Sequence, residues 1–312
     1  MSNLINGSID QSLIQSWENN FYTLSQQKQS FFDQSKAIKR VSFNSLYHNV
    51  ARMDKTSLNR ATGRNPDVQL DEAVMDNRRM KKYSFHKQFI FDKKDIREAM
   101  ADPTSEVYMQ LMAAFNREKD KFIAETALGS VEVGDSNNGG TSTISAAADG
   151  VNTIDATSGL DYPKVKRIIT NFINRNVATG TMQNTDITLA VAGTDWDQLL
   201  NEDKFINNNY SSYHPIDKGG YLPKLFGMDL ITFAGNDTGV ITDADITLKE
   251  DGSIRSCLAL APQSIYFDVG NVGFRYIPEL ESKVRSSGLY FYCEMAAMRS
   301  EGVKVQEIRT TF

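Results

Sequence analysis

The chain contains 312 residues, of which 40% are hydrophobic and 23% charged, and its formal net charge is -5 at pH 7. This balance is typical of a globular protein and argues against global disorder. The slight acidity argues against nucleic-acid binding as the main task of the chain. The length allows one large domain or two ordinary ones with a substantial core.

The two cysteines, Cys257 and Cys293, lie in apolar strand-like runs, where a thiol serves as a small core residue. So few cysteines indicate a reducing compartment rather than secretion. The N-terminus shows no basic region followed by an apolar one, and no apolar run approaches the ~18 residues of a membrane span. We therefore expect a cytoplasmic product with no membrane partner.

An amphipathic helical segment is predicted near the N-terminus, because apolar residues recur there at spacings of three and four: Ile9, Leu13, Trp17, Phe21 and Leu24. The residues around it are mostly Gln, Ser and Asn. Such an arm has too little apolar surface for a core of its own. We expect it to lie on its own domain or on a neighbouring chain.

A long two-stranded hairpin is predicted next. The residues from Val41 to Tyr47 alternate loosely, and those from Tyr83 to Phe91 alternate clearly with the period of a strand. Between them, Gly63 and Asn65–Pro66 mark a turn in a polar stretch. Because an isolated two-stranded hairpin is marginally stable in water, we expect another surface to support it.

The predicted hairpin also contains a basic cluster, which consists of Arg78, Arg79, Lys81 and Lys82. Glu72 and Asp76 lie close to it in the sequence. This mixture of charges favours a salt-bridged hairpin surface over an RNA-binding site.

The strongest predicted element is a helix of about 26 residues, which at ~1.5 Å per residue is ~39 Å long and spans a whole domain. Asp102 is a suitable N-cap, Pro103 suits the first helical position, and Gly129 is expected to end the helix. One face of the helix is apolar, with Val107, Leu111, Ala114, Phe115 and Phe122.

A Gly-, Ser- and Thr-rich stretch then marks a boundary, after which helices and apolar strands alternate. A helix around Val165–Ile173 precedes a strand at 186–193, a short helix at 194–203, and strands at 228–235 and 257–261. This alternation predicts a compact mixed-sheet domain of about 100 residues. The chain then returns to long strands.

Motifs for catalysis and metal binding are missing from the sequence. The three histidines, His48, His86 and His214, stand far apart without a second ligand at metal-binding spacing. The Asp-rich stretch 236–252 does not match a calcium loop, and no phosphate-binding or nucleophile motif occurs. We therefore predict no enzyme activity, no cofactor and no metal.

The order of these parts resembles the major capsid protein of tailed bacteriophages, with the Hong Kong-type shell fold. The likeness is carried by "FDKKDIREAMADPTSEVYMQLMAAFNREKDKFIAETALG", which resembles the spine helix and its lead-in. It is also carried by "LFGMDLITF … CLALAPQSIYFDVG", which resembles the end of the axial domain, and by "SEGVKVQEI", which resembles a closing peripheral strand.

The resemblance implies an α+β fold with four parts. They are an N-terminal arm at 1–50, an extended loop at 51–92, a peripheral domain with the spine helix at 93–160 and 266–312, and an inserted α/β axial domain at 161–265. In the last strands, Leu289, Phe291, Cys293 and Met295 are then expected to face the spine helix, while Tyr290 and Tyr292 meet the arm, the extended loop or a neighbouring subunit. Val303–Ile308 is expected to close the same sheet.

The resemblance further implies a structural protein that assembles as hexamers and pentamers into an icosahedral shell around double-stranded DNA, without sequence-specific DNA binding. The arm is too short for a built-in scaffolding domain, so a separate scaffolding protein, a portal and decoration proteins are candidate partners. Assembly is expected in the host bacterial cytoplasm, without covalent crosslinks, and the product is the virion capsid. The candidate inter-subunit contacts are Trp17, Phe21, Gly63, Arg64, Asn65, Pro66, Arg78, Arg79, Tyr290 and Tyr292.

Two alternatives stay open. An encapsulin-like compartment would have the same fold with a protein cargo, and the Ile9–Leu24 segment fits the helical N-terminus of such shells. A soluble α/β enzyme is the other alternative, with its site in 161–265. There Asp195, Trp196 and Asp197 form the only tight polar–aromatic group, although the cap and first turn of a short helix explain them as well.

Overall fold

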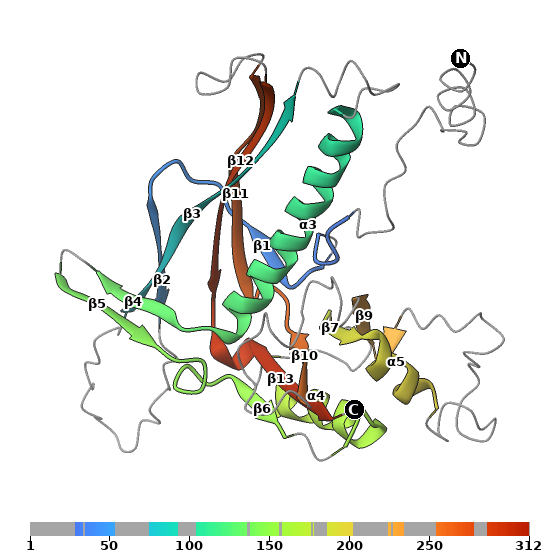
Figure 1. The fold of residues 1–312 in the computed structure, drawn as a ribbon. Helices are drawn as coiled ribbons and strands as arrows, with labels where there is room; N and C mark the ends of the chain where they lie inside the picture. Colours follow the sequence, from blue (N-terminus) through green and yellow to red (C-terminus); the bar gives the residue numbers. More distant parts are fainter. Residues whose placement is uncertain are drawn as a thin grey trace, which may run out of the picture.

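The computed structural model describes residues 29–33, 35–53, 75–92, 104–135, 138–155, 158–175, 177, 186–201, 224–225, 227–233, 254–277 and 286–311. Their strands form two sheets, one of seven strands and one of six. Figure 1 shows that the long strands β3, β11 and β12 run beside the helix α3, while the second sheet lies at the lower end of this body.

The seven-stranded sheet is ordered β1-β11-β12-β3-β4-β5, and β2 pairs with β3 off this path. Its strands are β1 (Ile38–Arg40), β2 (Tyr47–Met53), β3 (Met75–Asp92), β4 (Val131–Asp135), β5 (Asn138–Ile144), β11 (Ile265–Ile277) and β12 (Ser286–Arg299). The 18-residue β3 pairs with β2 along 75–81 and with β12 along 82–92. The predicted strand 83–91 is therefore confirmed, and it belongs to the body of the subunit.

The helix α3 (Thr104–Leu128) covers one face of the long strands, as the period of its apolar residues predicted. The inward face of β12 is buried against it and contains Leu289, Phe291, Cys293 and Met295. The rings of Phe115 and Phe291 meet edge to face, with centroids 5.8 Å apart. The expected contact between the spine helix and this strand face is confirmed.

The six-stranded sheet is ordered β6-β13-β10-β7-β9-β8. Its strands are β6 (Asn152–Ile154), β7 (Thr188–Ala192), β8 (Lys224–Leu225), β9 (Met228–Phe233), β10 (Ile254–Leu260) and β13 (Val305–Thr311). The helices α4 (Tyr162–Asn174) and α5 (Gly193–Leu200) pack on one face around a core that includes Phe172, Leu189 and Leu199. The α4 helix begins at Asp161, whose carboxylate accepts the N–H of Lys164 at 2.9 Å.

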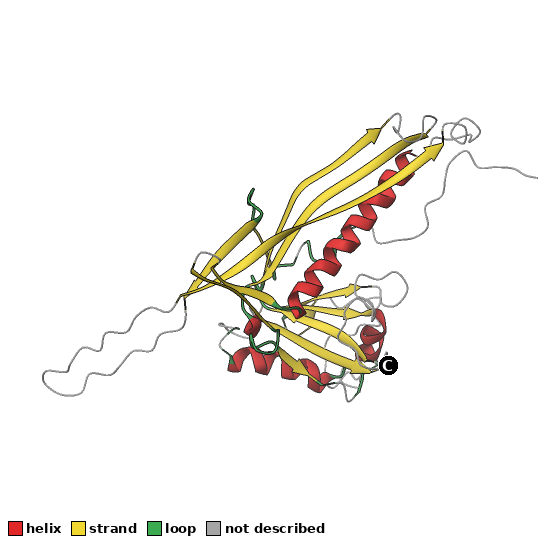
Figure 2. Cartoon of the chain, turned by 60° about the vertical axis from the view of Figure 1, so that its left-hand side comes forward, coloured by secondary structure: helices red, strands yellow, loops and turns green. Residues whose placement is uncertain are grey.

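The two sheets share a core, so they form one continuous body (Figure 2). Ala190, Leu258 and Val305, from the second sheet, belong to the same buried cluster as Leu111 of α3 and Phe291 of β12. The described part of the N-terminal arm joins this cluster through two residues that are almost fully buried, Phe32 and Ala37.

The prediction that Val303–Ile308 closes the long sheet is wrong. A 3-10 turn, η1 (Gly302–Lys304), redirects the chain after β12, and β13 then pairs with β10 and β6 in the second sheet. The physical reason is burial on both sides, because Val305 enters the core shared by the two sheets while Ile308 enters the core under α4. A strand buried on both faces is stable only inside a covered sheet.

Candidate functional site

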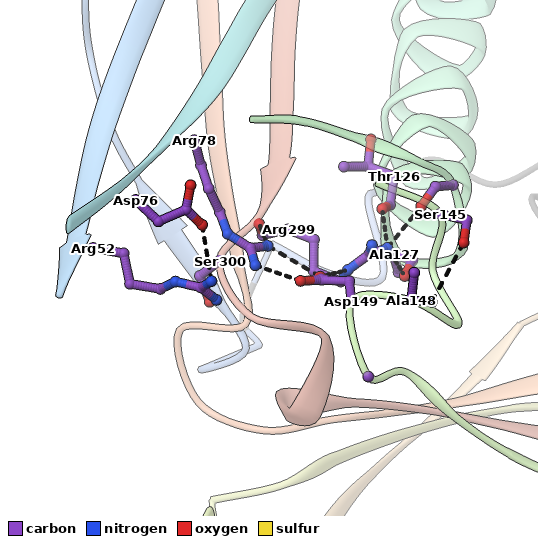
Figure 3. A network of polar contacts seen from close by, with 12 residues as sticks. Arg52, Asp76, Arg78, Thr126, Ala127, Ser145, Ala148, Asp149, Arg299 and Ser300 are labelled. Atoms are coloured by element: carbon purple, nitrogen blue, oxygen red, sulfur yellow. Dashed lines mark hydrogen bonds and ion pairs between the residues drawn. The ribbon is translucent and has the colours of Figure 1, made fainter. Parts of the chain in front are cut away.

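A buried polar junction lies where β3, β12, the end of α3 and the loop 145–151 meet (Figure 3). Its centre is Asp149, whose carboxylate accepts hydrogen bonds from Arg78 of β3 and Arg299 of β12. The distance from Arg78 Nη1 to Asp149 Oδ2 is 3.0 Å, and that from Arg299 Nε to the same oxygen is 2.8 Å. Arg78 is 1% exposed and Arg299 0%. One carboxylate thus holds two strands to the loop that leads into the second sheet.

Arg299 also caps the C-terminal end of α3. Its Nη1 donates to the carbonyl oxygens of Ala127 at 2.9 Å and Gly129 at 2.8 Å. The last carbonyls of a helix have no partner within the helix and carry partial negative charge, so a buried guanidinium satisfies them well. The prediction that Gly129 ends the helix is confirmed, because Leu128 is the last helical residue and the N–H of Gly129 donates to the carbonyl of Glu125 at 2.7 Å. Gly129 is not among the glycines with positive φ, and the side chain of Arg299 caps the carbonyls that remain.

The loop around Asp149 is shaped to reach the two arginines. The N–H of Asp149 donates to the carbonyl of Ser145 at 2.9 Å, and Gly150 follows with φ +93°. At Gly302, an added Cβ would lie 2.3 Å from the carbonyl oxygen of Asp149, so the chain after β12 also requires glycine to approach the loop. The junction therefore fixes backbone as well as side chains.

The electrostatics of the junction stabilise the ionised carboxylate. Burial alone would raise the pKa of Asp149, but the hydrogen bonds and charges of Arg78 and Arg299 outweigh it and hold this pKa below its usual range. Removing one partner from such a cluster leaves a buried charge without compensation, which is costly. The junction therefore holds elements of the subunit together through side chains that are almost fully buried.

The structure corrects the interpretation of the basic cluster. Arg78 was a candidate inter-subunit contact, but its guanidinium is buried inside the subunit in the junction. Arg79 is half-buried and lies over the ring of Tyr47, with its guanidinium carbon 3.9 Å from the ring centroid. Lys82 points elsewhere, toward Asp268, at 3.5 Å. The sequence cluster is thus divided among different environments. Arg78 and Arg79 point to opposite faces of the sheet, and Lys82, on the same face as Arg78, lies beside a different carboxylate.

The two candidate tyrosines lie on the face of the long sheet that is opposite to α3. Tyr290 and Tyr292 stack with ring centroids 5.9 Å apart, and His86 lies beside Tyr290 at 6.3 Å. Tyr292 is 41% exposed. A groove of about 810 Å³ runs along this face, with Arg275 and Glu294 among its lining residues. The structure therefore presents an aromatic surface with charges of both signs.

The other candidate contacts, which are Trp17, Phe21, Gly63, Arg64, Asn65 and Pro66, lie outside the described residues, as do Asp102 and Pro103. Sequence reasoning did not single out Asp149 or Arg299. The one available signal was an acidic residue in a glycine-flanked turn and an arginine in an apolar strand, which is too common a pattern to identify a pair 150 residues apart.

The group proposed for the alternative enzyme does not form a site. Asp195 is buried in the first turn of α5 and accepts a hydrogen bond from the thiol of Cys257 at 3.3 Å, whereas Asp197 faces solvent and Trp196 packs against the core. The placement in the first turn is confirmed, although Ala192 occupies the cap position. Lys164 is buried nearby, and burial lowers its pKa, but its ammonium binds the carbonyls of Ser158 and Gly159.

The described part of the chain was also compared with what metal binding and membrane crossing require of side chains and helices. No group of three or more His, Cys, Asp or Glu side chains is arranged there to hold a metal ion. None of the described helices is long and apolar enough to cross a membrane.

Solved structures with the same fold come from bacteriophage capsids. A chain in the capsid structure of Helicobacter pylori bacteriophage KHP30 superposes with a TM-score of 0.73 at 13% identity, covering 100% of this chain and 99% of that one. A chain in the capsid asymmetric unit of cyanophage Pam1 gives 0.68 at 13% identity, with coverages of 100% and 99%. A chain from Mycobacterium phage Che8 gives 0.68 at 11% identity, with coverages of 99% and 98%. The fold is thus that of the phage shell proteins.

The sequence supports the same class. No curated protein matches the chain. The family model described as phage capsid protein, however, matches residues 9–311, and the chain therefore belongs to that family. It is a structural major capsid protein that self-associates into the shell of the virion, with the mixed α+β fold that the resemblance implied.

Proposed function

We propose that copies of this chain form hexamers and pentamers, and that these close into an icosahedral shell around double-stranded DNA. The observation that supports this proposal is the exposed aromatic face of Tyr290 and Tyr292 on a subunit whose other described long-sheet face is covered by α3. Tyrosine is enriched where protein surfaces meet, because it buries a large area and keeps a polar group for hydrogen bonding. The net charge of -5 suits a shell that does not bind its enclosed DNA tightly.

The proposal assigns a role to each part of the chain. Residues 161–265, together with β6 and β13 of the same sheet, form the axial domain near the centre of each capsomer. The rest of residues 93–160 and 266–304 forms the peripheral body around the spine helix. The arm before Gln29 and the loop between β2 and β3, residues 54–74, reach across neighbouring subunits, with the turn Gly63–Pro66 and Arg79 among the contacts. Assembly takes place in the host bacterial cytoplasm, with a separate scaffolding protein and a portal, and the shell has no catalytic activity.

Expression of the chain alone, followed by size-exclusion chromatography and negative-stain microscopy, tests this proposal. We expect capsomers, together with irregular or incomplete shells when no scaffolding protein is present. A stable monomer at assembly concentrations would contradict the shell proposal, and closed, uniform shells from the chain alone would contradict the need for a separate scaffolding protein. Mass spectrometry and nucleic-acid analysis of native particles distinguish DNA from the protein cargo of an encapsulin-like compartment.

A further inference from the structure

A short part of the N-terminal arm is fixed to α3 by a buried carboxylate. This part consists of residues 30–33 and 35–37, and we call it the strap. Asp120 of α3, which is 0% exposed, accepts the N–H groups of Phe31 at 2.8 Å and Phe32 at 3.4 Å, and it also binds the hydroxyl of Ser30. Hydrogen bonds to a buried carboxylate are strong, and leaving such a group without its donors is costly. The strap is therefore held firmly at its α3 end.

The strap is bound to the second sheet as well, near the beginning of β7. The hydroxyl oxygens of Ser35 and Thr188 are 2.7 Å apart, and the ammonium of Lys36 forms an ion pair with Asp186. The side chains of that ion pair are 59% and 41% exposed, so water screens their attraction. The polar contacts of the strap with the β7 end are thus weaker than its contacts with α3.

Between these two ends, the strap completes the core that the two sheets share. Phe32 is 1% exposed and Ala37 is 0% exposed, and both belong to the cluster that contains Ile123 of α3 and Ala190 of β7. Removal of the strap would therefore leave a cavity in this shared cluster. The strap is part of what joins the second sheet to α3.

The other connections between the sheets lie close together. The chain passes from one sheet to the other in three segments, which are residues 145–151, 261–264 and 300–304. Within this group, the N–H of Ser300 donates to the carbonyl of Ser264 at 2.8 Å, and an added Cβ at Gly302 would lie 2.3 Å from the carbonyl oxygen of Asp149. Two bodies that are joined through one such neck can change their relative angle. A link outside the connecting segments, such as the strap, restrains that angle.

We propose that the strap couples the second sheet to α3, and that its release from β7 uncouples them. The firm hold of Asp120 and the weak contact at Thr188 determine where release begins, because the strap leaves β7 first and stays on α3. The N-terminal arm continues directly into the strap, so displacement of the arm acts on the stability of the second sheet. This inference concerns the single subunit and does not depend on the proposed hexamers and pentamers.

Hydrogen exchange of the full chain, measured by mass spectrometry at concentrations where it is unassembled, tests this inference. Ser35→Ala with Lys36→Ala removes the polar contacts with the β7 end and leaves the buried core intact. We expect exchange in β7 to become about tenfold faster relative to exchange in β12, because the second sheet then opens without the long sheet. Equal acceleration in the two strands would overturn the inference.

Phe89→Ala is the matched control, because Phe89 lies on β3 and packs against the same cluster without belonging to the strap. With the strap in place the two sheets open together, so this substitution should accelerate exchange in β7 and β12 by the same factor. A change confined to β12 would show that the sheets are uncoupled even when the strap is seated, and the inference would then be wrong.

A reversible disulfide provides a second measurement, made on a single protein. Ser35→Cys and Thr188→Cys, combined with Lys36→Ala, place two thiols where hydroxyl oxygens lie 2.7 Å apart, which is within reach of a disulfide. The native thiols are buried and do not compete. We expect accelerated exchange of β7 in the reduced form, and a return of the β7-to-β12 ratio to that of wild type in the oxidised form. A ratio that does not respond to oxidation would contradict the coupling.

Discussion

At the scale of single residues, the most consequential side chain is Asp149. It contacts two buried arginines from different strands, and one of these, Arg299, also caps α3. Asp149 is the carboxylate of this cluster, so it is the group that takes up a proton when the pH falls. The acid stability of the subunit therefore depends on this residue.

We predict that Asp149→Asn lowers the free energy of unfolding by about 3 to 5 kcal/mol at neutral pH, because it leaves two buried cations without a counter-charge. The pKa of Asp149 is lower in the folded state than its unfolded value near ~3.9. Its ionic contribution is therefore complete above that value and is lost as the pH falls through the folded pKa. Urea unfolding at several pH values should show that the difference between the two proteins shrinks below pH ~4.

The control for this experiment is Asp186→Asn, which breaks an exposed ion pair with Lys36. Water and salt already screen that pair, so we expect little change in stability. If the gap between wild type and Asp149→Asn stayed constant down to acidic pH, the ionised carboxylate would not be what holds the junction.

At the scale of elements, α3 and β12 determine which surfaces are core and which are free. Alternate residues of β12 face α3 and are buried, while the intervening tyrosines face away. Phe291, on the covered face, therefore contributes to the folding of the subunit, whereas its neighbour Tyr292, on the other face, can contribute to association.

We predict opposite effects for the two adjacent substitutions. Phe291→Ala should lower the free energy of unfolding by about 3 to 5 kcal/mol, because it leaves a cavity beside Phe115 and Phe274. Tyr292→Ala should lower the free energy of unfolding by about 1 kcal/mol or less, since the ring is 41% exposed, but it should lower the yield of assembly. Thermal unfolding measures the loss of stability in each variant, and sedimentation of assembly products measures the loss of assembly. The proposed contact fails if Tyr292→Ala assembles at the wild-type yield.

At the scale of the whole molecule, the two sheets behave as one body because they share a buried cluster, and the Asp149 junction joins them at the end of α3. Strands β2 and β3 pair along Tyr47–Met53 and Met75–Lys81, and residues 54–74 between the two strands lie outside the described part. We expect the turn in that stretch to affect contacts between subunits more than the fold of one subunit.

Deletion of Gly63–Asp67 should therefore leave the unfolding transition of the isolated subunit within about 1 kcal/mol of wild type, as for other surface changes. The same deletion should lower the yield or the thermal stability of assembled particles. The entropic cost of closing the loop changes little when five residues are removed, so we expect no loss of monomer stability from the shorter loop. Circular dichroism and particle counts by electron microscopy provide the two measurements. An unfolded deletion protein would place this turn in the core.

The period of apolar residues was sufficient to predict several elements in isolation. The long helix, the strand at 83–91, the alternation of β12 and the α/β order of the second sheet all follow from local pattern, because helix and strand impose fixed spacings on buried side chains. The order of these elements also carried the resemblance to phage capsid proteins, which the family match confirms.

The amino-acid sequence by itself thus determined the elements, the class of protein and the covered face of β12. Only the tertiary structure decided that β13 joins the second sheet, that Arg78 is internal and that Arg299 caps the end of α3. Each of these depends on a partner distant in the chain, such as Asp149 for Arg299. The spacing of apolar residues along the chain shows which face of an element is apolar. It does not show which distant element supplies the counter-charge or the next strand.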